Sequence, residues 1–313
     1  MKHCPNPWRS NVKIVVVTLC LLLCSAHVQA KTVRLLTIGN SFAENALTYL
    51  PEIVESAGHK LIVGRANLGG CTLERHWRHA AQFEADPEGK DGSPYGGGKY
   101  SLKDMLTKDD WDFITIQQVS FKSHDLQTYQ PYADNLYRYI RKHAPDATIL
   151  IHQIWAYRVD DRRFKPANKG REPHTQAMMY QQVRQTYHTL AEKLNLQVIP
   201  SGDAMYHADT DKTWGYRIDS EFDFANAQYP NLPDQTHSLH VGWSWRKQDG
   251  RWRLRMDGHH ASVAGKYLLG CVWFETFFKE SVVGNGFVPK GIDSEYAEFL
   301  QRTAHAAVSA QSK

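Results

Sequence analysis

The stretch 35-LLTIGNSFAENALTYLPEIVESAG-58 joins a strand pattern to a helix pattern through a single turn. Its first residues are apolar or β-branched, as in a buried strand, and the residues after Gly39-Asn40-Ser41 have apolar side chains at helical spacing. A serine at such a turn is lifted out of the sheet. Its N–H lies at a helix N-terminus, where developing negative charge is stabilised, as a nucleophile requires. Serine is also a favoured helix N-cap, so the turn alone fits either role.

Strand and helix patterns alternate along the whole chain. Continuous apolar strand patterns are typical of parallel strands that are covered on both faces. We therefore expect an α/β fold, a three-layer α/β/α doubly wound parallel sheet, with its active site at the carboxyl ends of the strands. Strands are predicted at residues 33–38, 60–63, 113–116, 148–155 and 196–199, and helices at 44–57, 73–83, 129–143, 175–194 and 262–279.

A further pattern precedes the last of these helices. Two alternating segments flank Asp249-Gly250 within residues 240–256, which predicts a β-hairpin insertion before the last helix. Alternating tryptophans on such a hairpin suit either an aromatic platform for a sugar ring or the cover of a core.

The first thirty residues have the pattern of a secretory signal peptide. A basic start precedes the apolar run 14-IVVVTLCLLLCSA-26 and a small-x-small cleavage site that ends at Ala30. A retained anchor is the alternative, but the run is shorter than the roughly 20 residues of a spanning helix. We expect an exported protein, periplasmic or extracellular, without stable membrane insertion after cleavage. Loss of the three basic residues in this segment lowers the formal charge from +4 to about +1, which does not indicate nucleic-acid binding.

A second motif stands far from the first, in 256-MDGHHASVAGKYLLGC-271. Asp257 and His260 are three residues apart before a helix, so a carboxylate and an imidazole can meet in one short turn. A serine hydroxyl needs a base to take its proton, and the base needs an orienting carboxylate. His259 is an alternative base, and a helix-entry turn capped by Asp257 is the structural alternative.

Together these blocks resemble the SGNH (GDSL-type) hydrolase family. IGNSF resembles its first block, 67-NLGGCTLE-74 its second, and DGHH its last, the Asp-x-x-His block. The resemblance is greatest to a branch of exported bacterial members in which GNS replaces GDS and the third block contains glutamine. It implies an SGNH-hydrolase or flavodoxin-like fold, with a signal peptide at 1–30, a hydrolase domain at 31–285 that has an insertion at about 204–255, and a C-terminal extension at 286–313.

The resemblance also implies residue roles. Ser41 would be the nucleophile, His260 the general base and then acid, and Asp257 the residue that orients the imidazole. The N–H groups of Ser41 and Gly70 would form two parts of the oxyanion hole, with Gly69 in reserve. The family's third-block asparagine is missing, and 112-DFITIQQVS-120 stands in its place. The side-chain amide of Gln117, or else of Gln118, is the expected third donor; both glutamines could also simply end a strand.

Substrate contacts are expected where the fourth strand ends, in 152-HQIWAYR-158. Gln153, Trp155 and Arg158 are the candidates, with core packing and surface exposure as the alternative. We expect no metal, because neither the histidine pair of HWRH nor the pair His237 and His240 has a nearby zinc-ligand set. We expect no cofactor either, since glycine-rich nucleotide or phosphate loops are missing.

The sequence therefore predicts a secreted serine ester hydrolase that removes O-acyl groups, most plausibly acetyl, from carbohydrate through an acyl-enzyme. The expected partner is a small-molecule or glycan ester. A lipid esterase or thioesterase of the same fold is one alternative, and a non-catalytic carbohydrate-binding relative is another. Cys71 and Cys271 are left after signal cleavage, and the sequence leaves open whether they form a disulfide.

Overall fold

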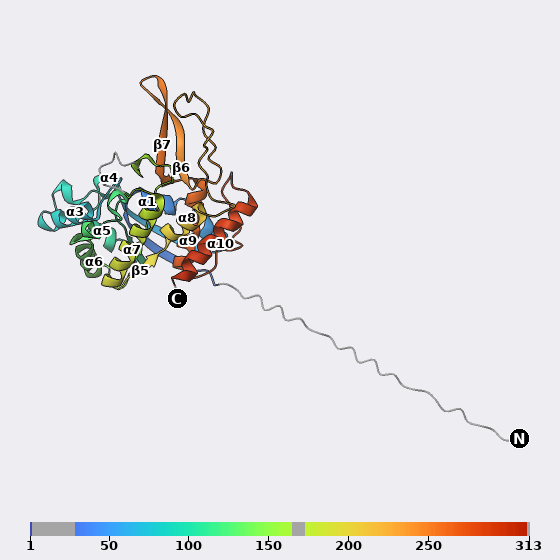
Figure 1. Ribbon diagram of the computed structural model, residues 1–313. Coiled ribbons are helices and arrows are strands. Elements are labelled where there is room, and N and C mark those ends of the chain that lie inside the picture. Colours follow the sequence, from blue (N-terminus) through green and yellow to red (C-terminus); the bar gives the residue numbers. More distant parts are fainter. Residues whose placement is uncertain (2–28, 165–172, 312–313) are drawn as a thin grey trace.

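Figure 1 shows a computed structural model of the chain, in which residues 1, 29–164 and 173–311 are described. Almost all of the expected signal peptide lies outside these residues, so that prediction stays a prediction. Among the described residues, no helix is both long enough and apolar enough to cross a bilayer.

Five parallel strands form the central sheet in the order β2-β1-β3-β4-β5, as the predicted fold class requires. The chain winds outward from β1 in both directions, so the strand order reverses between β1 and β3. The crevice at the carboxyl ends of these two strands is where ligands bind in open α/β sheets. Ser41 follows β1 there. The strands are β1 Thr32–Gly39, β2 Lys60–Asn67, β3 Phe113–Ile116, β4 Thr148–His152 and β5 Gln197–Ile199.

Helices cover both faces of the sheet (Figure 1). One layer contains α1 Ser41–Leu47, α2 Leu50–Ser56, α8 Ser201–Asp209, α9 Val263–Phe278 and α10 Ser294–Ala310. The other contains α3 Leu73–Ala85, α5 Leu102–Thr107, α6 Tyr132–His143 and α7 Gln176–Leu194, with the short α4 Tyr95–Gly98 beside them. The apolar side chains that these elements share form one core, so the layers fold as a unit.

Some predicted boundaries were wrong. The helix expected at 44–57 is broken into α1 and α2, because Pro51 begins a new helix near its N-terminus. The strand expected at 148–155 ends at His152. The hairpin precedes α9, as expected, but α9 is not the last helix: α10, within the expected C-terminal extension, follows it and packs on α8 and α9.

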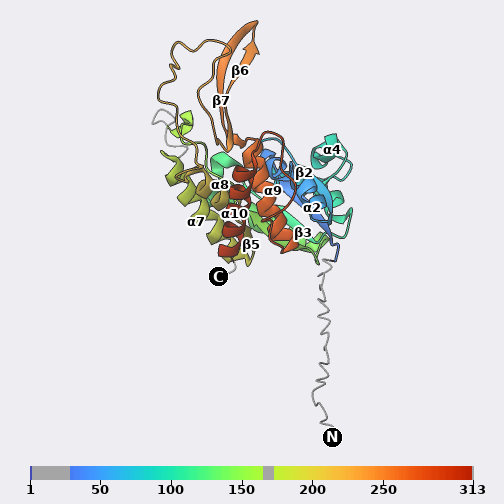
Figure 2. The same cartoon turned by 90° about the vertical axis from the view of Figure 1, so that its right-hand side faces the viewer.

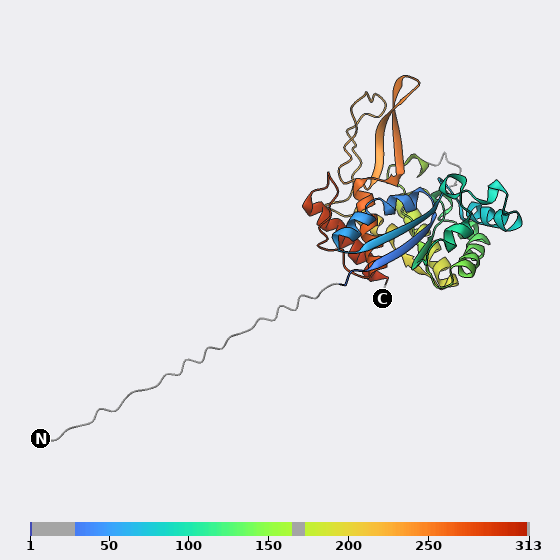
Figure 3. The same ribbon diagram turned by 180° about the vertical axis from the view of Figure 1, so that it is seen from behind.

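The predicted hairpin is confirmed as β6 His240–Gln248 and β7 Arg251–Ala261. Asp249 and Gly250 both have positive φ, 51° and 75°, as the central residues of a tight hairpin turn require. The hairpin projects beyond the three layers (Figure 2), and Figure 3 shows the same projection from behind. It rises from the end of the molecule at which β7 passes into α9.

The two cysteines of the folded part are both buried and both free. They do not form the disulfide that the sequence left open. Burial raises the pKa of the Cys71 thiol to about 11, so it is protonated at neutral pH.

Candidate active site

The turn after β1 is closed by Asn40, not by Ser41. Asn40 is the N-cap of α1, and its Oδ1 accepts a hydrogen bond from the N–H of Phe42 at 3.1 Å. Its Nδ2 donates to the carbonyl of Cys71 at 3.0 Å. Ser41 is therefore the first helical residue, and its hydroxyl is not used as a cap. An uncharged side chain thus closes the turn and leaves the serine free.

Three predicted residues from distant parts of the sequence meet at this turn. The Nε2 atom of His260 lies 2.9 Å from Oγ of Ser41, across 219 positions of sequence. On the other side of the ring, Nδ1 of His260 lies 2.9 Å from Oδ2 of Asp257. Because a carboxylate only accepts, Nδ1 has the hydrogen and Nε2 is left to accept one from the serine hydroxyl.

A β-bulge gives Asp257 and His260 this arrangement. In the hairpin Gly242 pairs with Asp257, but His240, two residues before Gly242, pairs with Ala261, four residues after Asp257. The extra residues bend β7 locally, and bulges of this kind redirect side chains beside functional sites. The carboxylate then accepts the N–H of His260 at 3.1 Å, which closes the turn.

Two buried side chains hold the bulge against the body of the protein. Asn45, one helical turn after Ser41, accepts the N–H of Ala261 on its Oδ1 at 2.7 Å. Trp155 donates from its indole N–H to the carbonyl of His259 at 2.9 Å. Asn45 was not among the predicted site residues; an amide among the apolar positions of the helix that follows a candidate nucleophile was the available signal.

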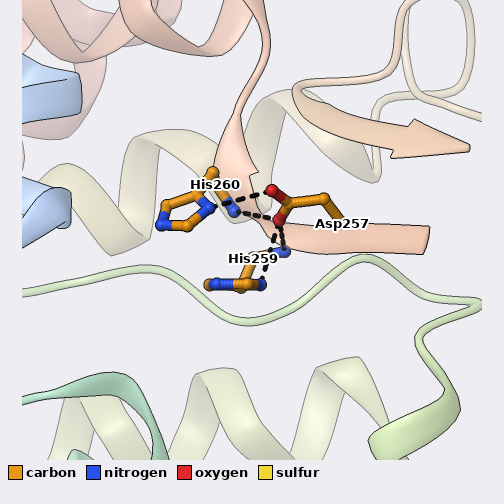
Figure 4. Close-up of side chains that lie close together, drawn as sticks. All are labelled: Asp257, His259 and His260. Atoms are coloured by element: carbon orange, nitrogen blue, oxygen red, sulfur yellow. Dashed lines mark hydrogen bonds and ion pairs between the residues drawn. The ribbon is translucent and has the colours of Figure 1, made fainter. Parts of the chain in front are cut away.

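The carboxylate of Asp257 interacts with two histidines, His259 and His260 (Figure 4). Its Oδ1 lies 3.0 Å from Nδ1 of His259, and its Oδ2 faces His260. Burial alone would raise the pKa of this carboxyl, but the hydrogen bonds from His259 and His260 outweigh burial and hold the pKa far below its usual range. Asp257 is therefore ionised wherever the protein is folded at ordinary pH, and it can stabilise an imidazolium at His260.

The second block forms a tight turn beside the first. Leu68 donates its N–H to the carbonyl of Gly39 at 3.0 Å, and Cys71 donates back to Leu68 at 3.1 Å. Gly70 has φ of +58° within this turn, which favours glycine. Among the described residues, no acceptor faces the N–H groups of Ser41 and Gly70. Both N–H groups therefore stay candidate donors to an oxyanion.

The structure does not place Gln117 as the third oxyanion donor that the sequence predicted. It is only 1% exposed, and its amide Nε2 donates to Oδ1 of Asn40 at 2.8 Å. Its Oε1 faces Nδ1 of His152 at 2.7 Å. The side chain lies against Gly39, where a Cβ atom would come within 2.9 Å of it. The glutamine side chain thus supports the turn that contains Ser41 from within the protein. Its amide is bonded to Asn40 and does not face solvent, where an oxyanion donor would be needed.

The backbone groups that contact Asn40 determine which atom donates in each of these hydrogen bonds. The Cys71 carbonyl only accepts and the Phe42 N–H only donates, which fixes the amide of Asn40. Asn40 then fixes the amide of Gln117, whose Oε1 must accept from Nδ1–H of His152. Burial lowers the pKa of His152 to about 3, so its ring is neutral. A neutral buried chain of amides and imidazole therefore underlies Ser41.

The reserve candidate Gln118 is also used elsewhere. It is fully buried, its Oε1 accepts from the N–H groups of Leu73 and Val119, and its Nε2 donates to Thr128. It connects the start of α3 to the segment after β3. It is not available as a third oxyanion donor.

His76 is a supporting residue that the sequence suggested only as half of a metal pair. Its Nε2 donates to the carbonyl of Gly39 at 3.0 Å, and its Nδ1 lies 2.8 Å from the hydroxyl of Tyr95. Burial lowers the pKa of His76 to about 4, so it is neutral. The ring satisfies the last carbonyl of β1, directly before the nucleophile turn. In the sequence, the position of His76 on the apolar face of the helix predicted at 73–83 was the available sign that its side chain is buried.

The three residues that were expected to contact substrate are all buried, contrary to that prediction. Gln153 is 0% exposed and donates to Asp203 at 2.8 Å, and Trp155 is 1% exposed and packs on Phe42. Arg158 is 0% exposed, because it forms a double hydrogen bond with Asp160 and ties the hairpin base to the body. These residues build the floor and the anchor of the site, and they do not reach its surface.

A metal ion is the one cofactor that the site residues would suit by type. Asp257, His259 and His260 have ligand atoms within 4.8 Å of one another. The separations of 2.9 and 3.0 Å are hydrogen-bond distances between a carboxylate and two imidazoles, and they account for the cluster without an ion. The expectation of no metal and no cofactor stays an expectation.

The fold and this site define a class: a half-buried serine at the first β–α turn of a doubly wound α/β/α protein, with a histidine and an aspartate from a later bulge. Residues 34–234 match the family described as a domain of unknown function, DUF4886, and the chain belongs to that family. No curated protein matches the chain.

The solved structure of one similar protein agrees on the fold, and two further ones are more distant. A DUF4886 family protein from Bacteroides uniformis is 25% identical, with a TM-score of 0.67 over 90% of this chain and 96% of its own. A protein from Parabacteroides merdae described as a GDSL-like lipase is 14% identical, with a TM-score of 0.45 over 80% of this chain and 98% of its own. A possible lipase from Chitinophaga pinensis is 13% identical, with a TM-score of 0.40 over 79% and 98%.

Proposed function

We propose that this protein is an exported serine ester hydrolase that removes O-acyl groups, most plausibly acetyl, from carbohydrate. One observation carries the proposal: the uninterrupted chain from Oγ of Ser41 to His260 to Asp257, with both links at 2.9 Å. Nucleophile, base and orienting acid stand in the order that acyl transfer to serine requires.

In the first half of the reaction, Oγ of Ser41 attacks the ester carbonyl while Nε2 of His260 takes its proton. Asp257 stabilises the imidazolium that forms. The N–H groups of Ser41 and Gly70 donate to the oxyanion, and each such donor typically contributes about 2.7–4 kcal/mol to the barrier reduction. His260 then protonates the leaving alcohol. In the second half, water attacks the acyl-enzyme with His260 again acting as base.

The decisive test is the Ser41→Ala variant with p-nitrophenyl acetate as substrate. Removal of the nucleophile should lower kcat by about 10⁶-fold, since the remaining groups act only as a unit. The circular dichroism spectrum and melting temperature should stay near the wild-type values, because Asn40 caps the helix. Turnover by the variant at the wild-type rate would refute the assignment.

A non-catalytic carbohydrate-binding relative is the competing function, and the missing third side-chain donor favours it. A fluorophosphonate probe separates the two, because it reacts only with an activated serine. Labelling of wild type but not of the Ser41→Ala variant supports the hydrolase. Unlabelled wild-type protein that still binds glycans would support the binder.

Substrate class and export have their own tests. Rates on acyl esters of increasing chain length, compared with acetylated polysaccharides, separate a deacetylase from a lipid esterase or thioesterase; a preference for long chains would favour the latter. N-terminal sequencing of the protein from a bacterial periplasm tests export, and a mature chain that begins at Lys31 is the expected result.

A further inference from the structure

The two faces of the projecting hairpin differ completely in chemistry. Successive residues of a strand point to opposite faces. On β7 one face therefore has Trp252, Leu254 and Met256. The other face has three arginines, and a fourth arginine on β6 lies directly opposite the middle one. We call these four residues the arginine track: Arg246, Arg251, Arg253 and Arg255.

The aromatic face is partly covered by the protein itself. The ring of Tyr229 stacks on Trp252 at 4.1 Å, with 4° between the planes. Phe224 contacts Trp243 at 4.8 Å, and the indole of Trp245 donates to the carbonyl of Asn231 at 2.8 Å. The loop before β6 thus covers the base of this face, where Trp243 is buried as part of a small core. Farther out, the stacked pair of Trp252 and Tyr229 stays 44% and 50% exposed.

The arginine track, by contrast, is bare. All four side chains are exposed, and in the described part of the chain none forms an ion pair with an acid. Within the described ranges, one side-chain hydrogen bond involves the track, from Arg255 to Oε1 of Gln248 at 2.7 Å. Arg246 and Arg253 are a directly opposed like-charge pair, which is destabilising in a hairpin. A charge cluster that costs stability and has no acidic partner among the described residues points to an external anion.

The track leads to the candidate active site. Asp257 is the next residue on the arginine face of β7 after Arg255, and its pairing with Gly242 continues the same register. Alternate residues on a strand are about 7 Å apart, so the three β7 arginines form a row toward the carboxylate that serves His260. A polymer held on the row would extend into the site that contains Ser41.

We propose that the arginine track binds an acidic polysaccharide, and that the ester acted on at Ser41 is carried by such a polymer. The second half of this statement rests on the proposed function; the binding does not. Arginine pairs well with carboxylates in a bidentate way, and Ser244 and Gln248 on the same face suit hydroxyl groups. A bilayer is a poorer fit, since this face offers no apolar side chain to enter it.

The test compares two variants of the full mature chain with equal changes in net charge. The track variant replaces Arg246, Arg251, Arg253 and Arg255 by glutamine. The control variant replaces four exposed cations elsewhere on the surface, Lys60, Lys108, Arg138 and Lys142, by glutamine. Affinity for polygalacturonate, with dextran as the neutral polymer, is measured by affinity electrophoresis at low and at physiological salt.

Wild type and the control should bind polygalacturonate, and their affinity should fall at higher salt. The affinity of the track variant should be lower than that of wild type by about tenfold or more. All three should hydrolyse p-nitrophenyl acetate equally, because the track does not touch the reacting groups. Equal binding by the track variant overturns the inference, as does equal binding of dextran by wild type. Tighter binding to phosphatidylglycerol vesicles or duplex DNA overturns the polysaccharide assignment.

The two proposals fail separately. A wild-type protein whose Ser41 does not react with fluorophosphonate, but whose polygalacturonate binding depends on the track, would refute the hydrolase and support the binding site. A reactive Ser41 with binding that is indifferent to the track would do the opposite. If both hold, the track variant should lose about tenfold in kcat/KM on acetylated polygalacturonate only.

Discussion

Replacement of Gln117 by leucine tests whether this residue supports the nucleophile turn or serves the oxyanion directly. In the structure its amide donates to Asn40 and its oxygen accepts from His152. Leucine has a similar volume and no hydrogen bonds. Asn40 keeps its bond from the Phe42 N–H and its bond to Cys71, so the turn keeps its cap. His152, however, loses the partner that its Nδ1–H has among the described residues.

The expected cost is that of one buried, unsatisfied N–H. His152 is 0% exposed, and its other ring nitrogen already lacks a partner among the described residues. Leaving a buried polar group unpaired costs about 1–3 kcal/mol. In a domain of this size, 1 kcal/mol shifts the melting temperature by about 2–4 °C. The Gln117→Leu variant should therefore melt between about 2 and 12 °C below wild type.

A second substitution makes the measurement specific. The double variant Gln117→Leu/His152→Phe removes both ends of the hydrogen bond and should recover part of the lost stability, since paired apolar replacements are nearly neutral. Calorimetry gives the melting temperatures, and p-nitrophenyl acetate gives kcat. An unchanged melting temperature together with a loss of about 10²–10³ in kcat would refute our reasoning, because that is the signature of a lost oxyanion donor.

The remaining predictions concern the acid and the two histidines. Asp257→Asn should lower kcat by about 10⁴-fold, because an amide that donates toward Nδ1 of His260 favours the wrong tautomer. The depressed pKa of Asp257 means that its contribution to stability is present above about pH 4 and is lost as the pH falls further, so urea midpoints should drop more steeply with acid in wild type than in this variant. His260→Ala should abolish fluorophosphonate labelling of Ser41. His259→Ala should retain labelling, since of these two histidines it is His260 that lies within hydrogen-bond distance of the serine hydroxyl; the reverse pattern would make His259 the base.

Local sequence patterns were enough to predict much of the fold. Continuous apolar runs marked β1 and β3 to within a residue or two, and Asp249-Gly250 marked the hairpin turn, because buried parallel strands and tight turns each impose a residue pattern over a few positions. The pattern failed where a single residue changed the path. Pro51 broke one predicted helix, and the helix that ends the chain lacked the strong apolar signal of α9.

Motif order also predicted which residues to examine at the site. Ser41, Asp257 and His260 were identified by residue type and position, and the structure brings them within hydrogen-bond distance. The sequence could not say whether Asn40 or Ser41 caps the helix, since both are good caps. That choice depends on Cys71 and Gln117, which reach Asn40 from other parts of the chain.

Tertiary structure alone decided which polar residues are buried and which face outward. Gln117, Gln153 and Arg158 follow strands toward the site, as expected of functional residues, yet all three are enclosed and bonded to protein partners. The arginine track is the opposite case, because its charge concentration depends on a register that pairs Arg246 with Arg253. Sequence determines the residue types and their local periodicity, whereas burial and pairing depend on which distant segment lies opposite, and only the folded chain fixes that.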